Sequence, residues 1–237
     1  QPADRVIEVG PGLGVLTGAL LDRVAGVTAV EKDNRLAPYL RERFAGHSKL
    51  NLMHADILDC DLAALFPSPG MKLVANLPYA IAARLLVELT AIPQPPELIV
   101  VTIQREVADR LVAQPSTRDF GLLSILLQRH YEITTVKHIS PSCFWPPPEV
   151  QSSISKLVRR PAPLGGPADE SALRDLLRHA FSRRRKTLGR SLRDLVADPL
   201  PALAQAGIAP TARAEELPPE KWPALLHALP PQPKLPL

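Results

Sequence analysis

Short runs rich in β-branched residues alternate with helical patterns along the first hundred residues, and this alternation constrains the fold more than any other feature. Alternating strands and helices build a parallel sheet with helices on both faces. Five strands are predicted: 5–9, 27–31, 50–54, 72–75 and 97–103. Two helices between them are predicted over 33–44 and 80–92, the second stopping before Pro93. The first part of the chain is therefore predicted as an α/β fold.

The later sequence predicts an antiparallel addition and then a change of fold class. A predicted helix over 122–129 precedes two strand-like runs, 131–138 and 150–158, which are expected to add an antiparallel edge. Residues 160–167, RPAPLGGP, have the composition of a linker. Beyond it four short helices are predicted, over 171–181, 186–196, 200–206 and 220–229, and the tail from 230 is expected to be loose. We predict an α/β domain over 1–160 and a small all-helical domain over 161–237.

Positive charge is concentrated in one part of the chain. Residues 159–196 carry ten Lys or Arg against four acids, whereas the whole chain has a net charge of +4, which leaves the remainder net −2. A basic segment beside a mildly acidic body indicates a nucleic-acid partner, although a charge run is usually a solvated face. In a helix over 186–196, residues 186, 190 and 193 are expected to share one face and leucines another. The candidate RNA contacts are Arg183, Arg184, Arg185, Lys186, Arg190 and Arg193.

Several function classes are disfavoured by composition. No apolar run approaches the roughly 18 residues of a membrane span, and the first residues are charged, unlike a secretory signal. Cys60 and Cys143 are too few for a disulfide framework, and reduced thiols in a cytoplasm are the simplest interpretation. No histidine pair has the spacing of a metal motif. We expect a cytoplasmic protein without a membrane partner or a metal site.

A glycine-rich turn, EVGPGLG over residues 8–14, follows the first predicted strand, and a helical pattern begins directly after it. Glycines let the backbone bend sharply and approach a ligand at a helix N-terminus, where amides are unpaired. The dinucleotide motif G-x-G-x-x-G needs a glycine where this chain has Val15, so NAD is disfavoured. Taken alone, such a turn is more often a structural loop than a ligand site.

Acids at the ends of the next two strands favour a ligand. Glu31 is placed to accept hydrogen bonds from ribose hydroxyls, and Asp56 from an adenine amino group, whereas Asp33 has the place of a helix cap. An acid opening the turn, spaced glycines and these strand-end acids suit S-adenosylmethionine, which has an adenosine and a cationic end but no pyrophosphate. The candidate cofactor-binding residues are Glu8, Gly10, Gly12, Gly14, Glu31, Lys32, Asp56, Ile57 and Asn76.

The sequence Asn76-Leu77-Pro78-Tyr79 follows the fourth predicted strand, at the edge where such folds keep their sites. An adenine amine is a poor nucleophile because its lone pair is delocalised into the ring. If the Asn76 side-chain oxygen and the Leu77 carbonyl each accept a hydrogen bond from one of its two N–H groups, the nitrogen becomes more tetrahedral and nucleophilic. Pro78 stiffens this corner, and Tyr79 offers a ring on which the base stacks. By itself the motif also fits a plain strand-to-helix turn.

A second aromatic residue favours the catalytic interpretation of this motif. Phe144 lies in a proline-rich loop before the last strand of the first domain and could close the other face of the base. Trp145, next to it, is open to a packing role, and such loops are often rigid connectors. An amine inside a paired helix is unreachable, so the target base must be flipped out or lie in a loop.

Seven segments carry a resemblance to one family: EVGPGLGVLT, VEKD, HADI, NLPY, QREVADRL, FWPPPEVQSS and AFSRRRKTLGRSL. From about residue 5 to 196 the chain resembles the KsgA/RsmA-type ribosomal RNA adenine dimethyltransferases, relatives of the Dim and Erm enzymes. The resemblance implies a Rossmann-like class I methyltransferase domain that uses S-adenosylmethionine. It implies dimethylation of two adjacent adenines in a hairpin near the 3′ end of small-subunit (16S) RNA, on an immature 30S particle. Asn76, Leu77, Tyr79 and Phe144 match its residues at the target base, and with Pro78 they are the candidate catalytic residues.

The chain departs from the family pattern at three places. Ala80 stands where the family usually has Asn, and Gln151 where Asp is often found. Family members begin with a short segment containing a Gln-x-Phe-Leu motif that helps enclose the methionine end of the cofactor, whereas this sequence begins at Gln1. We therefore expect weaker cofactor binding than in a chain that carries that segment.

Three other functions compete with this one. An Erm-type enzyme would methylate large-subunit RNA, and a non-catalytic assembly factor would bind RNA without methylating it. The intact NLPY sequence disfavours the assembly factor. An NAD-dependent oxidoreductase is a more distant alternative because of Val15.

Overall fold

The computed structural model describes residues 1–230, and the chain divides into two compact units. Unit 1 contains Gln1–Ala108 and Ile133–Arg159, and unit 2 contains Asp109–Glu132 and the chain from Arg160 onward. The start of the second stretch of unit 2 lies next to the predicted domain boundary, but residues 109–132, predicted in the first domain, belong to unit 2. The domain limits themselves stay a prediction.

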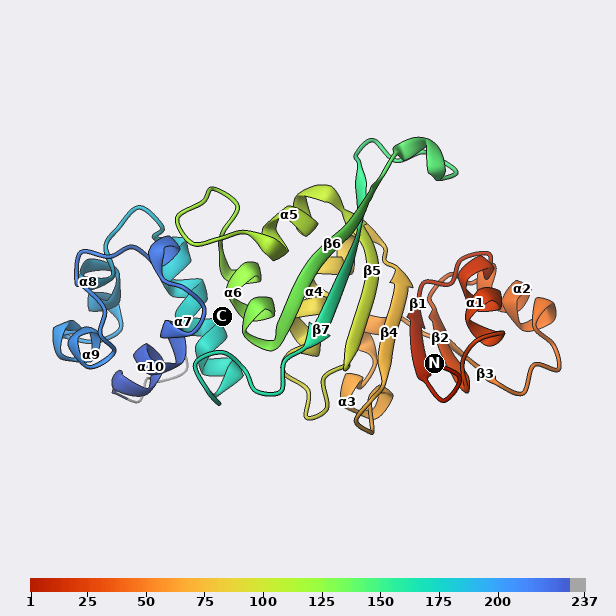
Figure 1. Ribbon diagram of the computed structural model, residues 1–237, viewed down its shortest axis with the longest axis horizontal. Coiled ribbons are helices and arrows are strands. Elements are labelled where there is room, and N and C mark those ends of the chain that lie inside the picture. The colour runs from red at the N-terminus through yellow and green to blue at the C-terminus, as the bar shows by residue number, and fades with distance from the viewer. Residues whose placement is uncertain (231–237) are drawn as a thin grey trace. The chain divides into compact units, whose positions relative to one another are not determined.

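A seven-stranded sheet forms unit 1, apart from the first two residues of its edge strand β6 (Figure 1). The strand order is β3-β2-β1-β4-β5-β7-β6; β1 to β5 are parallel, and β7 runs antiparallel to β5. The strands are β1 (Arg5–Val9), β2 (Gly26–Glu31), β3 (Leu50–His54), β4 (Lys72–Asn76), β5 (Leu98–Gln104), β6 (Tyr131–Ile139) and β7 (Ser152–Arg159). The Rossmann-like α/β fold and its antiparallel addition are confirmed, with each predicted strand shifted by no more than about two residues at either end.

Helices α1 and α2 pack on one face of this sheet. Their Leu21, Leu40 and neighbouring Phe44 join Val27 and Ala29 of β2 in a buried cluster, because apolar side chains alternate along the strand. The helical segments that follow β1 to β5 are α1 (Val15–Leu21), α2 (Leu36–Arg43), the 3₁₀ turn η1 (Ile57–Asp59), α3 (Leu62–Leu65), α4 (Tyr79–Leu89) and α5 (Arg105–Val112). A further 3₁₀ turn, η2 (Pro141–Cys143), lies between β6 and β7.

Both helices predicted in the first part of the chain are present but shorter than expected. Asp33 accepts hydrogen bonds from the backbone amides of Arg35 and Leu36, as a capping residue does, so the helix predicted over 33–44 begins only at Leu36. The helix predicted over 80–92 begins at Tyr79 and ends at Leu89, three residues earlier than predicted.

Unit 2 is helical, and its C-terminal helices surround a buried tryptophan. Trp222 is fully buried and its ring lies 6.1 Å from that of Phe181. The segments are α6 (Leu122–His130), α7 (Glu170–Ser182), α8 (Leu188–Ser191), η3 (Leu192–Asp194), α9 (Leu200–Gln205), η4 (Ala214–Glu216) and α10 (Lys221–Ala228). The helices predicted over 122–129, 171–181, 200–206 and 220–229 are confirmed to within about one residue at each end.

The single helix predicted over 186–196 is present only in part, because α8 and the 3₁₀ turn η3 cover residues 188–194 and residues 186–187 lie outside them. Thr187 forms a β-bridge with Arg213 instead, and the amides of Leu188 and Gly189 donate to carbonyls of residues 212 and 210 at 2.7 and 3.0 Å. Amides bonded to another segment cannot bond to carbonyls one turn earlier, so α8 cannot extend back through Lys186. The tertiary contact overrides the local helical pattern, and the expected common face for residues 186, 190 and 193 is lost with it.

A fully buried arginine holds α6 to the start of α7 within unit 2. The Arg129 guanidinium donates to both carboxylate oxygens of Glu170, at 2.9 and 3.0 Å, and to the carbonyls of Leu164 and Gly166. Removing a partner from a buried ion pair typically destabilises a protein by roughly 3 to 5 kcal/mol. The residues called a linker in the sequence are thus fixed by specific hydrogen bonds.

None of the helices within residues 1–230 is long and apolar enough to span a bilayer. The tail predicted to be loose lies, after Pro230, outside the described residues.

Candidate functional site

The strand ends bring the glycine turn, Glu31 and the corner at Asn76 to one edge of the sheet in unit 1. The Gly10 amide donates to the Val30 carbonyl at 2.9 Å, and the Gly12 amide to Glu31 Oε2 at 3.2 Å. A side-chain carbon at Gly10 would lie 3.4 Å from Pro78 Cδ, so the turn lies against the corner. The edge includes the point between β1 and β4 where the strand order reverses, and open α/β sheets bind ligands there.

Two glycines of the turn have different surroundings. Gly12 has φ of 59°, and a side-chain carbon there would meet no atom within 4 Å. Gly14 has φ of 77°, and its added carbon would lie only 2.6 Å from Phe44 Cε2 and 2.9 Å from Leu40 Cδ2. Gly14 is therefore required by packing against α2, whereas Gly12 borders open space that a ligand can fill.

Glu8 is a buried carboxyl with one oxygen, Oε2, that has no hydrogen-bond partner. Burial raises the pKa of Glu8 to about 7; the nearby Glu31 charge adds to this, and the Thr17 hydroxyl opposes it. The hydroxyl approaches the carboxyl, but without the geometry of a hydrogen bond. An unpartnered buried oxygen is unfavourable in a folded protein and is typical of a place where a ligand binds.

The second and third strand ends hold the other predicted cofactor residues. Glu31 Oε1 also accepts the backbone amide of residue 33, at 2.8 Å. Lys32 and Asp56, both predicted at the cofactor, form an ion pair with each other at 2.7 Å. The Lys32 ammonium, and next the Leu58 amide, hold the pKa of Asp56 below its usual value. Each Asp56 oxygen keeps a second lone pair for a ligand. The Ile57 side chain, at the start of η1, is buried.

The corner formed by residues 76–79 at the end of β4 begins with an exposed polar residue, which is followed by a buried apolar one. Asn76 is exposed, whereas the Leu77 side chain is buried and Pro78 precedes the first residue of α4. Tyr79 is half-buried, and its hydroxyl lies 2.6 Å from the Ser152 hydroxyl at the start of β7. The Tyr79 ring is therefore fixed both at its backbone and at its hydroxyl.

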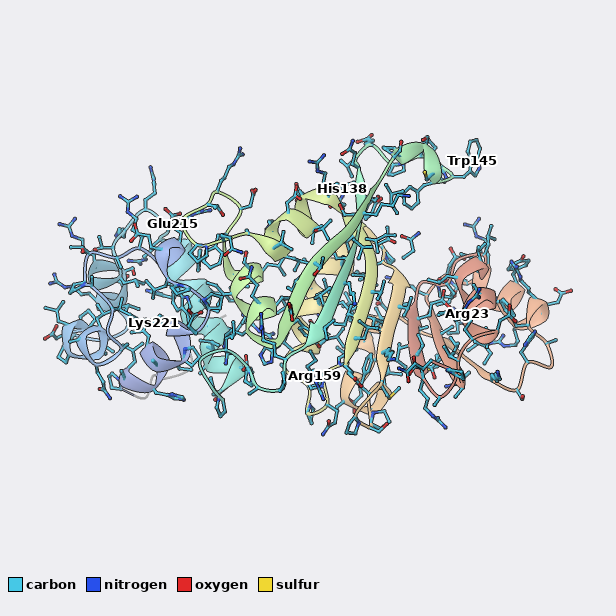
Figure 2. The ribbon with its side chains drawn as sticks, in the orientation of Figure 1. Arg23, His138, Trp145, Arg159, Glu215 and Lys221 are labelled. Carbon is cyan, nitrogen blue, oxygen red and sulfur yellow. The ribbon has the colours of Figure 1, made fainter. Side chains whose placement is uncertain are left out.

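The two aromatic residues of the β6–β7 loop differ in exposure. Phe144 is half-buried, as a residue facing a site can be, whereas the Trp145 side chain is 95% exposed. Figure 2 shows Trp145 projecting from the loop beyond the strands. Packing, the alternative role open to Trp145, is therefore excluded.

Sequence reasoning missed three residues that support the site. The Arg43 guanidinium of α2 donates to the Leu13 carbonyl of the glycine turn, Thr17 faces Glu8, and Ser152 holds Tyr79. All three act across gaps in sequence, and none belongs to a local pattern that predicts the contact.

The basic segment in unit 2 is divided between paired and unpaired side chains. Arg183 forms an ion pair with Asp194, and Arg184 with Glu215; Arg184 also donates to two carbonyls of residues 117–118. The other four predicted RNA contacts are exposed and form no ion pair within residues 1–230: Arg185, Lys186, Arg190 and Arg193. The predicted set therefore combines two structural arginines with four free cations.

Elsewhere in unit 1, an open cavity of about 520 Å³ lies between β2, β3 and α3, lined by residues such as Thr28, Met53 and Ala64. It contains none of the predicted site residues. Within residues 1–230 no group of three His, Cys, Asp or Glu side chains is arranged to hold a metal ion.

Comparisons with known proteins agree on one family. The model for ribosomal RNA adenine dimethylases matches residues 1–229. Ribosomal RNA small subunit methyltransferase A of Geobacter metallireducens is 39% identical over 237 residues, covering 97% of this chain and 86% of the relative. A Bradyrhizobium sp. protein of the same name is 44% identical over 231 residues, covering 94% of this chain and 79% of the relative.

Solved structures show the same fold over nearly the whole chain. A dimethyladenosine transferase from Plasmodium falciparum superposes with a TM-score of 0.76 at 24% identity, covering 95% of this chain and 89% of that one. The 23S rRNA methyltransferase ErmE gives a TM-score of 0.69 at 30% identity, covering 97% and 92%.

Proposed function

Because the chain belongs to the ribosomal RNA adenine dimethylase family, we propose that it methylates N6 of two adjacent adenines near the 3′ end of small-subunit ribosomal RNA. The methyl donor is S-adenosylmethionine, and the substrate is a hairpin on an immature 30S particle. The observation that carries the proposal is the exposed Asn76 at the carboxyl end of β4, against a glycine turn with an unpartnered buried acid.

The residues at the sheet edge fit S-adenosylmethionine. Open space beside Gly12 leaves room for a ligand against the backbone, and Glu8 keeps a free carboxyl oxygen for a donor group. Glu31 stands at the end of β2, where an acid accepts ribose hydroxyls. When bound, S-adenosylmethionine supplies a methyl group on a positively charged sulfur. The residues proposed to hold it are Glu8, Gly10, Gly12, Glu31, Lys32, Asp56, Ile57 and Asn76, and Gly14 is proposed to keep the turn packed against α2.

The corner after β4 makes the adenine amine reactive. The Asn76 side-chain oxygen and the Leu77 carbonyl each accept a hydrogen bond from one N–H of the amine, which draws the nitrogen towards tetrahedral geometry. Its lone pair is then less delocalised into the ring and would be free to attack, in line, the methyl group that bound S-adenosylmethionine would supply, with the carbon–sulfur bond breaking and the neutral thioether leaving. Positioning supplies the rate, and the proton leaves to water after transfer.

Aromatic side chains fix the plane of the target base. Tyr79, held by Ser152, stacks on one face, and Phe144 closes the other. Base stacking on an aromatic ring contributes roughly 1 to 3 kcal/mol, enough to hold a base that has left its helix.

Free cations of unit 2 bind the RNA backbone. Arg185, Lys186, Arg190 and Arg193 are exposed and available to phosphates. Phosphate contacts add affinity without reading sequence, so the choice of adenine depends on the sheet edge.

Methyl transfer to purified subunits tests the proposal. Radiolabelled S-adenosylmethionine is mixed with unmethylated small subunits, with large subunits in parallel, and the RNA is digested to nucleosides. We expect dimethyladenosine from small subunits alone.

The 30% identity to ErmE makes large-subunit RNA the second candidate substrate, and label in large subunits would favour it. No transfer to either subunit would leave a non-catalytic RNA-binding assembly factor. Asn76→Ala serves as the inactive control in the same assay.

A further inference from the structure

Trp145 is an aromatic side chain that unit 1 leaves almost entirely to solvent. Its 95% exposure is the highest among the large apolar side chains of residues 1–230. The other tryptophan of the chain, Trp222, is fully buried. Burying a side chain of this size is strongly favourable, so a tryptophan held in water is a candidate contact for a partner.

The loop that carries Trp145 rises from the edge of the sheet that holds the proposed active site. Ser152, the first residue of β7, pairs with Gln104, the last residue of β5. The same Ser152 hydroxyl lies 2.6 Å from the Tyr79 hydroxyl. The Gln151 carbonyl accepts the Arg105 amide at 2.9 Å. The base of the loop is thus fixed beside the corner where the target adenine is proposed to bind.

Trp145 and Phe144 cannot face the same base. The backbone at Phe144 is extended, with φ of −117° and ψ of 154°, and consecutive side chains of an extended chain point in opposite directions. Phe144 is half-buried and Trp145 is open, in agreement with this alternation. The three prolines at 146–148 restrict the backbone that follows Trp145.

We propose that Trp145 is a second stacking platform, which binds a base of the substrate RNA that flanks the target adenine. The inference rests on the proposed function. If the target adenine binds at this edge, the nucleotides next to it in the same RNA strand lie close to the loop that carries Trp145. Stacking needs no particular base and no charge, so it holds the strand in place without choosing its sequence. Trp145 is a positioning residue; it contributes no group to the methyl transfer.

Steady-state kinetics on unmethylated small subunits test the platform. Trp145→Ala is expected to raise KM for subunits about 5- to 150-fold, the range that one stacked base contributes, with kcat within about twofold. Trp145→Phe keeps a ring and is expected to show a smaller rise. Val136→Ala is the matched control, since Val136 is 57% exposed on β6 itself, outside the loop.

Intrinsic fluorescence supplies a readout independent of catalysis. The probe is an RNA hairpin with two adjacent loop adenines, titrated into the full chain. Quenching is expected in the wild type from exposed Trp145 and is expected to vanish in Trp145→Phe, whose sole tryptophan is the buried Trp222.

The outcomes separate the two proposals. A KM for Trp145→Ala within twofold of an active wild type overturns the platform, as does equal quenching in Trp145→Phe. A raised KM on subunits without any quenching by the hairpin also overturns it, because Trp145 would then contact a ribosomal protein. A wild type that methylates neither subunit overturns the proposed function, whereas quenching that depends on Trp145 would still establish the RNA contact.

Discussion

The carboxyl edge of the sheet and the basic segment over residues 183–193 differ in how the sequence places their side chains. At the edge, Glu31 and Asn76 are the last residues of their strands and Asp56 comes shortly after one, and pairing with neighbouring strands fixes where each strand ends. In the basic segment, residues adjacent in sequence have unrelated surroundings: Arg184 is bound to Glu215, and Arg185 is free. Strand ends therefore locate functional groups reliably, whereas a run of like charges does not tell which charges are available.

Removing the amide at the centre of the edge is the strongest test of this comparison. Asn76→Ala is expected to lower kcat for methyl transfer by about a hundredfold or more, because a positioned hydrogen bond is lost where charge develops. RNA affinity, measured by filter binding, should stay within about twofold. Asn51→Ala, an exposed amide within β3, is the control and should change neither. Near-normal kcat in Asn76→Ala would remove this residue from the mechanism.

The glycine turn separates a structural glycine from a ligand-facing one. Gly14→Ala is expected to lower the free energy of unfolding by roughly 2 to 4 kcal/mol, because its methyl group meets Phe44 and Leu40 in a strained backbone. Gly12→Ala carries only the strain, roughly 1 kcal/mol, but should weaken S-adenosylmethionine binding. Urea unfolding and calorimetric titration measure the two effects. Equal losses of stability in both variants would contradict this division.

The pH dependence of stability tests whether burial raises the pKa of the Glu8 carboxyl. Its pKa is raised from 4.5 to about 7 by burial, so between these values the folded protein binds the proton more tightly than the unfolded chain. Its contribution is complete below pH 4.5 and is lost as the pH rises through 7. Relative to Glu8→Gln, the unfolding free energy of the wild type should fall by roughly 3 kcal/mol from pH 4.5 to 8. Urea unfolding at several pH values measures it, and parallel curves for the two proteins would refute a raised pKa.

The basic segment offers the smallest effect and the sharpest contrast. Replacing Arg185 and Lys186 with alanine should weaken RNA binding roughly tenfold without loss of stability. The slope of the logarithm of the binding constant against the logarithm of the salt concentration should become less steep by about 1.5. Replacing Arg183 and Arg184 should instead lower thermal stability, because their ion pairs with Asp194 and Glu215 are broken. Salt titrations and thermal melts of both double variants decide the matter. Identical behaviour of the two double variants would mean that their ion pairs do not prevent Arg183 and Arg184 from binding RNA.

The sequence predicted the strands because each has a short apolar run that ends at a turn signal. Ser152, by contrast, is a β7 residue with no signal of its own, and its contact with Tyr79 depends on β7 pairing with β5 rather than with β6 alone. The helix predicted over 186–196 begins only at Leu188 because the amides of Leu188 and Gly189 donate to residues 212 and 210, which local periodicity cannot predict. Local patterns thus predict elements, while long-range hydrogen bonds decide where some of them stop.

Local patterns likewise give no sign that residues 109–132 pack within unit 2. Their packing within unit 2 joins stretches that are far apart in the sequence. Long-range partners of this kind leave no trace in periodicity, so the sequence predicts α6 as a helix but does not predict which unit it joins.

The buried Arg129 limits where a shortened form of this protein can end. A recombinant chain that stops at residue 160 would keep α6 but lose Glu170 and both carbonyls that receive the guanidinium. The unpaired Arg129 guanidinium could reach water only if the end of α6 unfolded. Unfolded backbone of this kind is readily cleaved by proteases. Expression trials of the catalytic half alone should therefore extend past the start of α7 or replace Arg129 with an apolar residue.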